Sequence, residues 1–317
     1  MHFGPARSPS GSCAEGIGIL SPLLPQDFIG NPHRDVLKHL LRAIGLARKF
    51  GARIVGLGGF TSVFGNEGVE LATASGMAIT SGNTFTAALA IEGIRRAAEL
   101  KGRSMSKCLL AVIGATGDIG SICTRLLARE VGQVAIAARN ETRLQDFAEK
   151  VSSESGKKVQ VFRRAAEAVK GADLVLTAAS SVAALIEPEV LKPGAVICDV
   201  GYPANVAKSV IEKRDDVLVF EGGLASWVGY ESLDVGSTLS EFSPHGTLHG
   251  CFAETLILAL EGQFVSFSLG RGNITEASIR EILSLADKHG FRLAPFSYGS
   301  QVYAELSDRN AAQSWSA

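Results

Sequence analysis

Residues 109–120 have the sequence LLAVIGATGDIG, an apolar run that ends in three spaced glycines. The apolar run predicts a buried strand, and the residues that follow predict a helix. Glycines at this spacing let the backbone turn tightly, approach a pyrophosphate and pack the helix on the strand, whereas a plain strand–helix turn needs no such set. The helix N-terminus adds oriented N–H groups for the phosphates. We therefore predict a dinucleotide site formed by Gly114, Ala115, Thr116, Gly117, Asp118, Ile119 and Gly120.

Short apolar segments alternate with helical or polar connectors on the C-terminal side of this motif. This alternation is typical of an α/β fold, a doubly wound parallel Rossmann sheet with crossover helices. Strands are expected at Leu109–Ile113, Val134–Ala138, Val159–Phe162, Leu174–Ala178, Ala195–Val200 and Val217–Phe220.

The end of the second expected strand indicates which dinucleotide binds. NAD sites usually carry a carboxylate there for the ribose 2′-hydroxyl. This chain instead has Arg139 and Asn140, followed by Arg143. A guanidinium forms paired hydrogen bonds to a phosphate, so these residues favour NADPH over NADH. The alternative is that Arg139 is an ordinary solvated surface residue.

Two further loops should line the cofactor cleft, because ligands bind beyond the carboxyl ends of parallel strands. The first is Ala178–Ser181, with Ala179 and Ser180, and the second is Val200–Pro203, with Gly201 and Tyr202. Gly222 and Gly223, after the last strand, are expected near the nicotinamide.

The remaining segments predict the domain organisation. Residues 1–16 are rich in Pro, Ser and Gly and are expected to be a flexible tail. Residues 17–104 predict an N-terminal α/β substrate domain with a connecting helix, and residues 105–224 the Rossmann domain. Beyond Gly223 the strand pattern ends, so residues 225–317 are expected to be a C-terminal helical region, with helices at Cys251–Leu260 and Ile274–His289.

Composition excludes several classes of protein. A hydrophobic fraction of 46% belongs to a folded chain, and a net charge of -1 gives no reason to expect nucleic acid. No apolar run reaches the roughly 18 residues that cross a bilayer, and the start lacks the pattern of a secretory signal. Cysteines without paired or ligand spacing suit a reducing cytoplasm and argue against a metal site.

Cys251 is the cysteine with a chemical interpretation. The other four, Cys13, Cys108, Cys123 and Cys198, lie in the expected tail, strands or a helix, where a free cysteine acts as a small hydrophobe. Cys251 follows Gly250 at the expected start of a helix, where the helix dipole stabilises a thiolate. It is therefore the candidate catalytic nucleophile.

Three titratable residues flank this cysteine. Glu254 falls one helical turn on and would raise the thiol pKa, so we interpret it as a structural or orienting group. His245 and His249 could assist proton transfer, but their spacing does not dictate contact, and a loop position explains them equally well.

Several segments together resemble a known family, the cyanobacterial long-chain acyl-[acyl-carrier-protein] reductases. They appear in the same order, between about residue 36 and about residue 296. The similar segments are Leu57–Ser62, Thr80–Thr84, Val112–Ser121, Gly201–Pro203, Cys251–Glu254, Glu261–Gly262, Gly270–Arg271 and Ile274–Thr275.

The resemblance implies a cytoplasmic NADPH-dependent enzyme that reduces a long-chain acyl thioester, on acyl carrier protein or coenzyme A, to a fatty aldehyde. It implies that Cys251 carries the acyl group, within hydride reach of the nicotinamide. An aldehyde-consuming enzyme and transient membrane-surface contact are expected as further partners. The loops with Phe60, Thr61, Ser62, Asn83 and Thr84 are expected to line the substrate cleft.

The chain departs from known patterns at three points. By the resemblance, the chain is expected to have a shorter region before the first similar helix than the cyanobacterial enzymes, and it has His245 and His249 before the cysteine. Gly82-Asn83-Thr84 resembles the shikimate dehydrogenase signature, but Phe85 stands where an Asp is usual. Two alternatives remain open: an NADP-dependent reductase of a small carbonyl compound, and a non-catalytic NADP-binding partner protein.

Overall fold

The computed structural model describes residues 1–233, 244–299 and 301–303. These residues form two compact units. The cysteine unit comprises the described residues of 1–86 and 224–294, and the dinucleotide unit those of 87–223 and 295–303. The chain thus leaves the cysteine unit after residue 86 and returns to it at residue 224, so residues 225–294 are not the separate C-terminal region that the sequence predicted.

The dinucleotide unit is built on a six-stranded sheet with the order β10-β9-β8-β5-β6-β7. Every neighbouring pair is parallel, and β5 pairs with both β6 and β8. This strand order confirms the doubly wound Rossmann fold, with its switch point between β5 and β8. The strands are β5 (Leu109–Ile113), β6 (Gln133–Ala137), β7 (Val159–Phe162), β8 (Leu174–Thr177), β9 (Val196–Asp199) and β10 (Leu218–Glu221).

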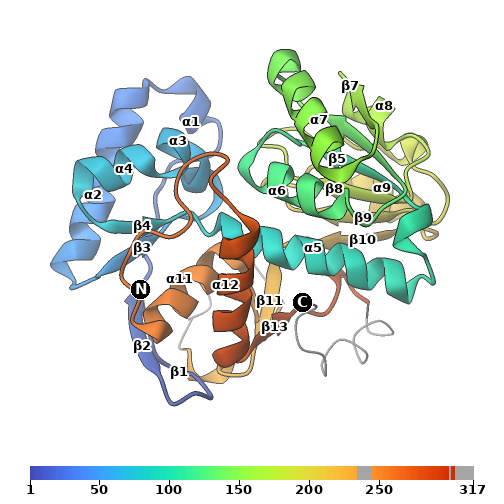
Figure 1. Cartoon of the computed structure of the whole chain (residues 1–317). Coiled ribbons are helices and arrows are strands. Elements are labelled where there is room, and N and C mark those ends of the chain that lie inside the picture. Colours follow the sequence, from blue (N-terminus) through green and yellow to red (C-terminus); the bar gives the residue numbers. More distant parts are fainter. Residues whose placement is uncertain (234–243, 300, 304–317) are drawn as a thin grey trace. The chain divides into compact units, whose positions relative to one another are not determined.

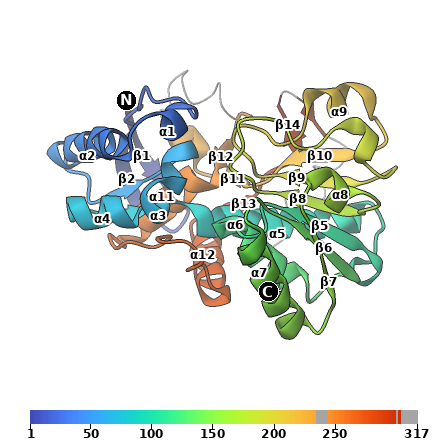
Figure 2. The same cartoon turned by 90° about the horizontal axis from the view of Figure 1, so that it is seen from above.

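Helices cover both faces of this sheet, and Figure 2 shows α9 and α7 on opposite sides of it. Side chains alternate between the faces of a strand, so Ala111, Ala135 and Val175 share one face. On that face they pack in one buried cluster with Val169 of α8 and Val210 of α9. The helices are α6 (Asp118–Leu127), α7 (Glu141–Ser155), α8 (Ala165–Val169) and α9 (Lys208–Lys213), and the unit also holds the hairpin of β14 (Ser297–Tyr298) and β15 (Gln301–Val302).

The cysteine unit begins with an antiparallel hairpin, β1 (His2–Arg7) and β2 (Cys13–Ile17), where the sequence predicted a flexible tail. The Phe3 ring packs edge-on against Phe252 at 5.4 Å, and Ser8 Oγ lies 2.9 Å from Nδ1 of the buried His289. The turn of the hairpin is formed by Ser8, Pro9, Ser10, Gly11 and Ser12, between the two strands. The prediction was wrong because these partners lie more than 240 residues away in sequence.

The rest of the cysteine unit mixes helices with two small sheets, which Figure 1 shows. β3 and β4 form a parallel pair, and β11 pairs antiparallel with β12 and β13, so strands do continue beyond Gly223. These strands have three or four residues, too few for a readable alternation. The elements are α1 (Asp27–Gly30), α2 (His33–Lys49), β3 (Ile54–Gly56), α3 (Phe64–Glu67), α4 (Val69–Ser75), β4 (Ala78–Thr80), β11 (Leu224–Trp227), β12 (Thr247–His249), α11 (Gly250–Glu261), α12 (Glu276–Lys288) and β13 (Phe291–Leu293).

Two helices that the sequence predicted are present, the connecting helix and the last helix. Helix α5 (Asn83–Leu100) is the long helix that leads from one unit into the other. Helix α12 is capped by Thr275, whose Oγ1 accepts a hydrogen bond from Ser278 N at 3.0 Å. None of the helices described is long and apolar enough to cross a membrane. Short 3₁₀ turns complete the fold at Gly59–Val63, Met105–Lys107, Pro188–Val190 and Tyr230–Ser232.

Candidate active site

Cys251 lies in the first turn of α11, where α11 meets two loops of the cysteine unit. A Cβ atom added at Gly58 would lie 3.7 Å from the Cys251 sulfur. A Cβ added at Gly82 would lie only 2.1 Å from the Cys251 Cα, and Gly82 has a φ of +77°. The start of α11 is therefore seated directly on the backbone of Gly82, in a space that only glycine leaves open.

The electrostatics at the sulfur are a balance between burial and backbone N–H groups. Burial raises the pKa of the Cys251 thiol, and the negative charge of Glu254 raises it further. Hydrogen bonds from the N–H groups of Phe252 and Gly59 act in the opposite direction. The net pKa of the thiol is above its usual range. The sequence analysis expected the helix N-terminus to stabilise a thiolate, but the backbone donors there do not outweigh burial. A thiolate that forms there nevertheless meets two backbone donors.

Local hydrogen bonds hold the Gly58–Gly59 loop in place. Thr61 Oγ1 donates to Gly58 O at 2.7 Å and accepts from Gly58 N at 2.9 Å. Ser62 Oγ donates to Gly59 O at 2.7 Å. The Phe60 ring packs against the Phe28 ring at 5.9 Å. Thr61 and Ser62, predicted to line a substrate cleft, thus also fix the backbone that carries the Gly59 N–H.

Glu254 joins α11 to the segment that leads from β4 into α5. Its side chain is fully buried and accepts hydrogen bonds from Thr80 Oγ1 and, at 2.8 Å, from Phe85 N. Gly82 N and the Ser268 hydroxyl also bond to it. Burial raises the pKa of Glu254. The structure therefore gives Glu254 an orienting role, because it holds the Gly82 turn against the first turn of α11.

Thr84 and Asn83 are enclosed in the same region, at 1% and 6% exposure. Thr84 N donates to Ser268 Oγ at 3.0 Å, and Thr84 Oγ1 accepts from Ser268 Oγ at 2.6 Å. Both polar groups of Thr84 thus already have protein partners. Ser268 was missed by sequence reasoning, because it lies 184 residues from Thr84 and belongs to no motif.

The two histidines before Cys251 have different surroundings. His245 is exposed, and its Nε2 pairs with Glu231 Oε1 at 3.0 Å. His249 ends β12 and occupies the N-cap position of α11, two residues before the sulfur. Of the two, His249 is therefore the one next to the helix start.

The glycine motif has the local geometry that dinucleotide binding requires. Gly114 has a φ of +79°, and a Cβ there would lie 2.7 Å from Ala178 O, at the switch point of the sheet. Gly117 is the N-cap of α6, and a Cβ on Gly120 would lie 2.3 Å from Gly114 O. Of the other predicted residues in the motif, Ala115 and Asp118 are buried, and Thr116 and Ile119 are half-buried.

Two guanidinium groups lie beyond β6, where the adenosine ribose is expected. Arg139 and Arg143 are exposed, and neither forms an ion pair with a described residue. Asn140 is instead the cap of α7, with its Oδ1 accepting from Arg143 N at 2.9 Å. The next residue, Glu141, pairs with Arg163 at 2.7 Å. Arg139 and Arg143 therefore remain the candidates for a phosphate.

Asn205 and Asp199 fix the two other predicted cofactor loops. Asn205 Oδ1 accepts from Thr177 Oγ1 at 2.6 Å and from Ala179 N at 3.0 Å. Asp199 accepts from Gly201 N and Asn205 N, both at 2.9 Å, and burial raises the pKa of Asp199 to about 6. Ser180 and Tyr202 are left exposed on these loops.

The C-terminal hairpin contributes to the same network, because Tyr298 OH donates to Asp199 Oδ2 at 2.9 Å. Sequence reasoning missed Asp199, Asn205 and Tyr298. An Asp at a strand end before Gly-Tyr-Pro was the available signal for the first, whereas Tyr298 lies 99 residues away from its partner.

One family of known proteins is similar to the dinucleotide unit only. The family model of shikimate / quinate 5-dehydrogenase matches residues 96–221, which lie within the dinucleotide unit. Quinate dehydrogenase from Corynebacterium glutamicum in complex with NAD has a TM-score of 0.32 and 17% identity over 41% of this chain and 50% of its own. A likeness that weak supports no argument about function.

Two curated relatives are similar to nearly the whole chain. Aminotransferase PigE from a Serratia species is 30% identical over 308 residues, which are 95% of this chain but only 35% of PigE. This chain thus spans about a third of the length of PigE.

The second relative has a comparable length. The long-chain acyl-[acyl-carrier-protein] reductase of Synechococcus elongatus is 31% identical over 296 residues, which are 90% of this chain and 84% of the relative. Similarity on this scale includes both the Rossmann unit and the segments around Cys251. The chain is thus an NAD(P)-dependent oxidoreductase that belongs to the family of long-chain acyl-[acyl-carrier-protein] reductases.

Proposed function

We propose that this protein reduces a long-chain acyl thioester to a fatty aldehyde with NADPH, through an acyl group carried on Cys251. The observation that carries the proposal is the position of the Cys251 sulfur, at the start of α11 with the N–H groups of Phe252 and Gly59 directed to it. Membership of the acyl-[acyl-carrier-protein] reductase family supports the same chemistry.

Acyl transfer to Cys251 is the first step. The thiol loses its proton, and the thiolate attacks the thioester carbonyl, so that a new C–S bond forms and the carbonyl oxygen becomes an anion. Backbone N–H groups at the helix start stabilise such an oxyanion in an enclosed site. The bond to the carrier sulfur then breaks, and the carrier leaves as its thiol with the proton that Cys251 gave up.

The residues of the dinucleotide unit fit a phosphorylated dinucleotide. Gly114 and Gly120 keep free the space that side chains would fill, and the N-terminus of α6 favours phosphate. Arg139 and Arg143 would hold the 2′-phosphate that distinguishes NADPH from NADH. NADPH, when bound, supplies the hydride that reduces the acyl carbonyl.

Cys251 and its neighbours complete the cycle. Reduction of the acyl group leaves a tetrahedral hemithioacetal on the sulfur. Its C–S bond breaks as the hydroxyl proton is lost, which releases the aldehyde and returns the thiolate. The N–H groups of Phe252 and Gly59 then stabilise this thiolate, as they did before the attack on the thioester. Because the carrier departs before reduction, the kinetics should be ping-pong.

The two alternatives from the sequence have less support. A small-carbonyl reductase of the shikimate type draws on similarity confined to residues 96–221. It also leaves the donors around Cys251 without a purpose, as does a non-catalytic NADP-binding protein.

The test is an intact-mass measurement after mixing the protein with a long-chain acyl thioester in the absence of NADPH. We expect one added acyl group, located on Cys251 by peptide mapping, and none in the Cys251→Ala variant. Cys13→Ala, which removes an exposed thiol, is the matched control and should still be acylated. A wild-type protein that makes aldehyde without any adduct would refute the covalent route.

A further inference from the structure

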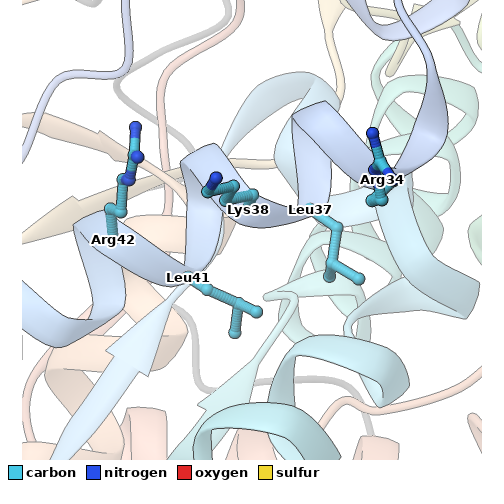
Figure 3. Close-up of a pocket in the computed structure, with 5 residues that line it drawn as sticks. All are labelled: Arg34, Leu37, Lys38, Leu41 and Arg42. Carbon is cyan, nitrogen blue, oxygen red and sulfur yellow. The ribbon is translucent and has the colours of Figure 1, made fainter.

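Helix α2 carries a row of cations on its solvent side. Five of its residues are Arg or Lys and one is Asp, although the whole chain has a net charge of -1. Arg34, Lys38 and Arg42 follow one another at intervals of four residues, so they lie along one side of the helix. They line an open pocket together with Leu37 and Leu41, and Figure 3 shows the two arginines extending away from the leucine tips.

Two other basic groups of α2, on His33 and Arg48, contact side chains of the same unit, whereas the cations of this row have few partners. His33 pairs with Glu70 at 2.6 Å, and Arg48 hydrogen-bonds to the sulfur of Met77. Arg34 has only its exposed neighbour Asp35 at 3.8 Å. Lys38 and Arg42 form no ion pair with any residue that the structure describes. The row is thus available to an external anionic group.

The two leucines of the row connect it to the cysteine loop through an apolar cluster. Leu37 and Leu41 are half-buried and pack on the apolar cluster that contains Leu40 and Leu57. Leu57 directly precedes the Gly58–Gly59 loop that contacts Cys251. A partner bound to α2 therefore rests on the same cluster that supports the cysteine loop.

We propose that the α2 row, defined as Arg34, Leu37, Lys38, Leu41 and Arg42, is where the acyl carrier protein docks. This inference rests on the proposed function, since it assigns a place to the donor of the acyl group. An acidic carrier, whose thioester arm is attached through a phosphodiester, matches three exposed cations, two of which have no ion pair among the described residues. The two leucines offer apolar contact beside them. Such complementary charge mainly accelerates encounter and fixes orientation.

The composition of the row argues against other anionic surfaces. Polybasic membrane sites usually cluster about four to eight Lys or Arg residues, more than this row provides. Its leucines are half-buried in the protein and do not form an exposed apolar face for insertion into lipid. A protein partner that needs few, spaced charges fits these residues better.

The test compares one acyl chain on three donors: acyl carrier protein, coenzyme A and uncharged N-acetylcysteamine. The variant R34E/K38E/R42E is measured beside K170E/K208E/K213E, which makes the same charge change on exposed lysines of the dinucleotide unit. We expect kcat/KM for the carrier to fall about tenfold or more at low salt in the α2 variant alone. The loss should shrink at high salt, and the rate with N-acetylcysteamine should stay unchanged.

Several outcomes would overturn the proposal. They are an unchanged rate with the carrier, an equal loss on all three donors, and an equal loss on carrier and coenzyme A, which would mean that the row recognises phosphate. Loss of binding to anionic vesicles with no loss on the carrier would assign the row to a membrane. If the triple variant unfolds, K38A/R42A gives the same comparison with a smaller expected loss.

A direct binding measurement separates this inference from the proposed function. Acyl carrier protein is titrated onto the Cys251→Ala protein and onto the same protein with R34E/K38E/R42E. Weaker binding of the second supports docking on α2 even if no thioester is ever reduced. Equal binding by both rejects docking on α2 and leaves the chemistry of Cys251 untouched.

Discussion

The two units differ in how their candidate site residues are brought together. The dinucleotide unit presents its candidate cofactor residues on loops at one edge of a single parallel sheet, within residues 114–203. The cysteine unit gathers its site from four separate segments, residues 58–59, 80–85, 251–254 and 268. The buried carboxylate of Glu254 links the last three of them. Cofactor binding and thiol chemistry should therefore be separable by mutation.

Replacement of the nucleophile is the largest test of that separation. Cys251→Ala removes the only group proposed to hold the acyl chain, so kcat should fall by a factor on the order of 10³ or more. NADPH binding, followed by fluorescence titration, should stay within about twofold of the wild type, because the residues proposed to bind it lie in the other unit. Retained aldehyde formation would contradict the assignment of Cys251.

Gly82 tests how tightly the cysteine unit is built. Gly82→Ala places a Cβ 2.1 Å from the Cys251 Cα, so the start of α11 must move. We expect a loss in the free energy of unfolding of about 3 to 5 kcal/mol, in the range of severe backbone and packing defects. Chemical denaturation measures it.

Gly76→Ala is the matched control for this prediction. Gly76 also has a positive φ, +62°, but a Cβ there meets nothing within 4 Å. It should cost about 1 kcal/mol through backbone strain alone. Equal losses in the two variants would mean that close packing at Gly82 has no special weight.

The choice between NADPH and NADH tests the dinucleotide unit. The double variant R139A/R143A removes two charged hydrogen-bonding groups, worth about 1.5 to 3 kcal/mol each when fully used. Both guanidinium groups are exposed, so solvent screens much of this energy, and KM for NADPH should rise about 10-fold to 100-fold. KM for NADH and acylation of Cys251 should stay unchanged. Equal effects on KM for both cofactors would mean that these arginines do not recognise the 2′-phosphate.

The smallest expected effect is in the reactivity of the thiol. Because burial holds the pKa of Cys251 above its usual range, the thiol keeps its proton at neutral pH. The rate of its alkylation should rise about tenfold per pH unit from pH 7 to 9 without reaching a plateau, and it should trail that of N-acetylcysteine. A plateau below pH 8 would show that the backbone donors outweigh burial.

The sequence predicted the dinucleotide unit well because its signals are local. The run from Leu109 to Gly120 contains the strand, the turn and the helix start, and each later strand is an apolar segment of its own. The parallel order of the strands follows from that alternation.

The cysteine site was predictable only in part. The sequence identified Cys251 and the Gly58–Ser62 and Gly82–Thr84 loops, but the links between them come from Thr80, Phe85 and Ser268. The raised thiol pKa depends on burial, which a motif does not encode. The β1–β2 hairpin was missed for a similar reason, because its partners Phe252 and His289 lie at the other end of the chain.

Labelled hydride provides the most direct test of the account. The acyl-enzyme is formed without reductant, freed of unbound thioester, and then mixed with NADPH that carries deuterium at the transferable position of the nicotinamide. We predict one molecule of aldehyde for each acylated Cys251, with a single deuterium at its carbonyl carbon. An isolated adduct that releases only fatty acid, or no product, would contradict the claim that the thioester on Cys251 is the species reduced.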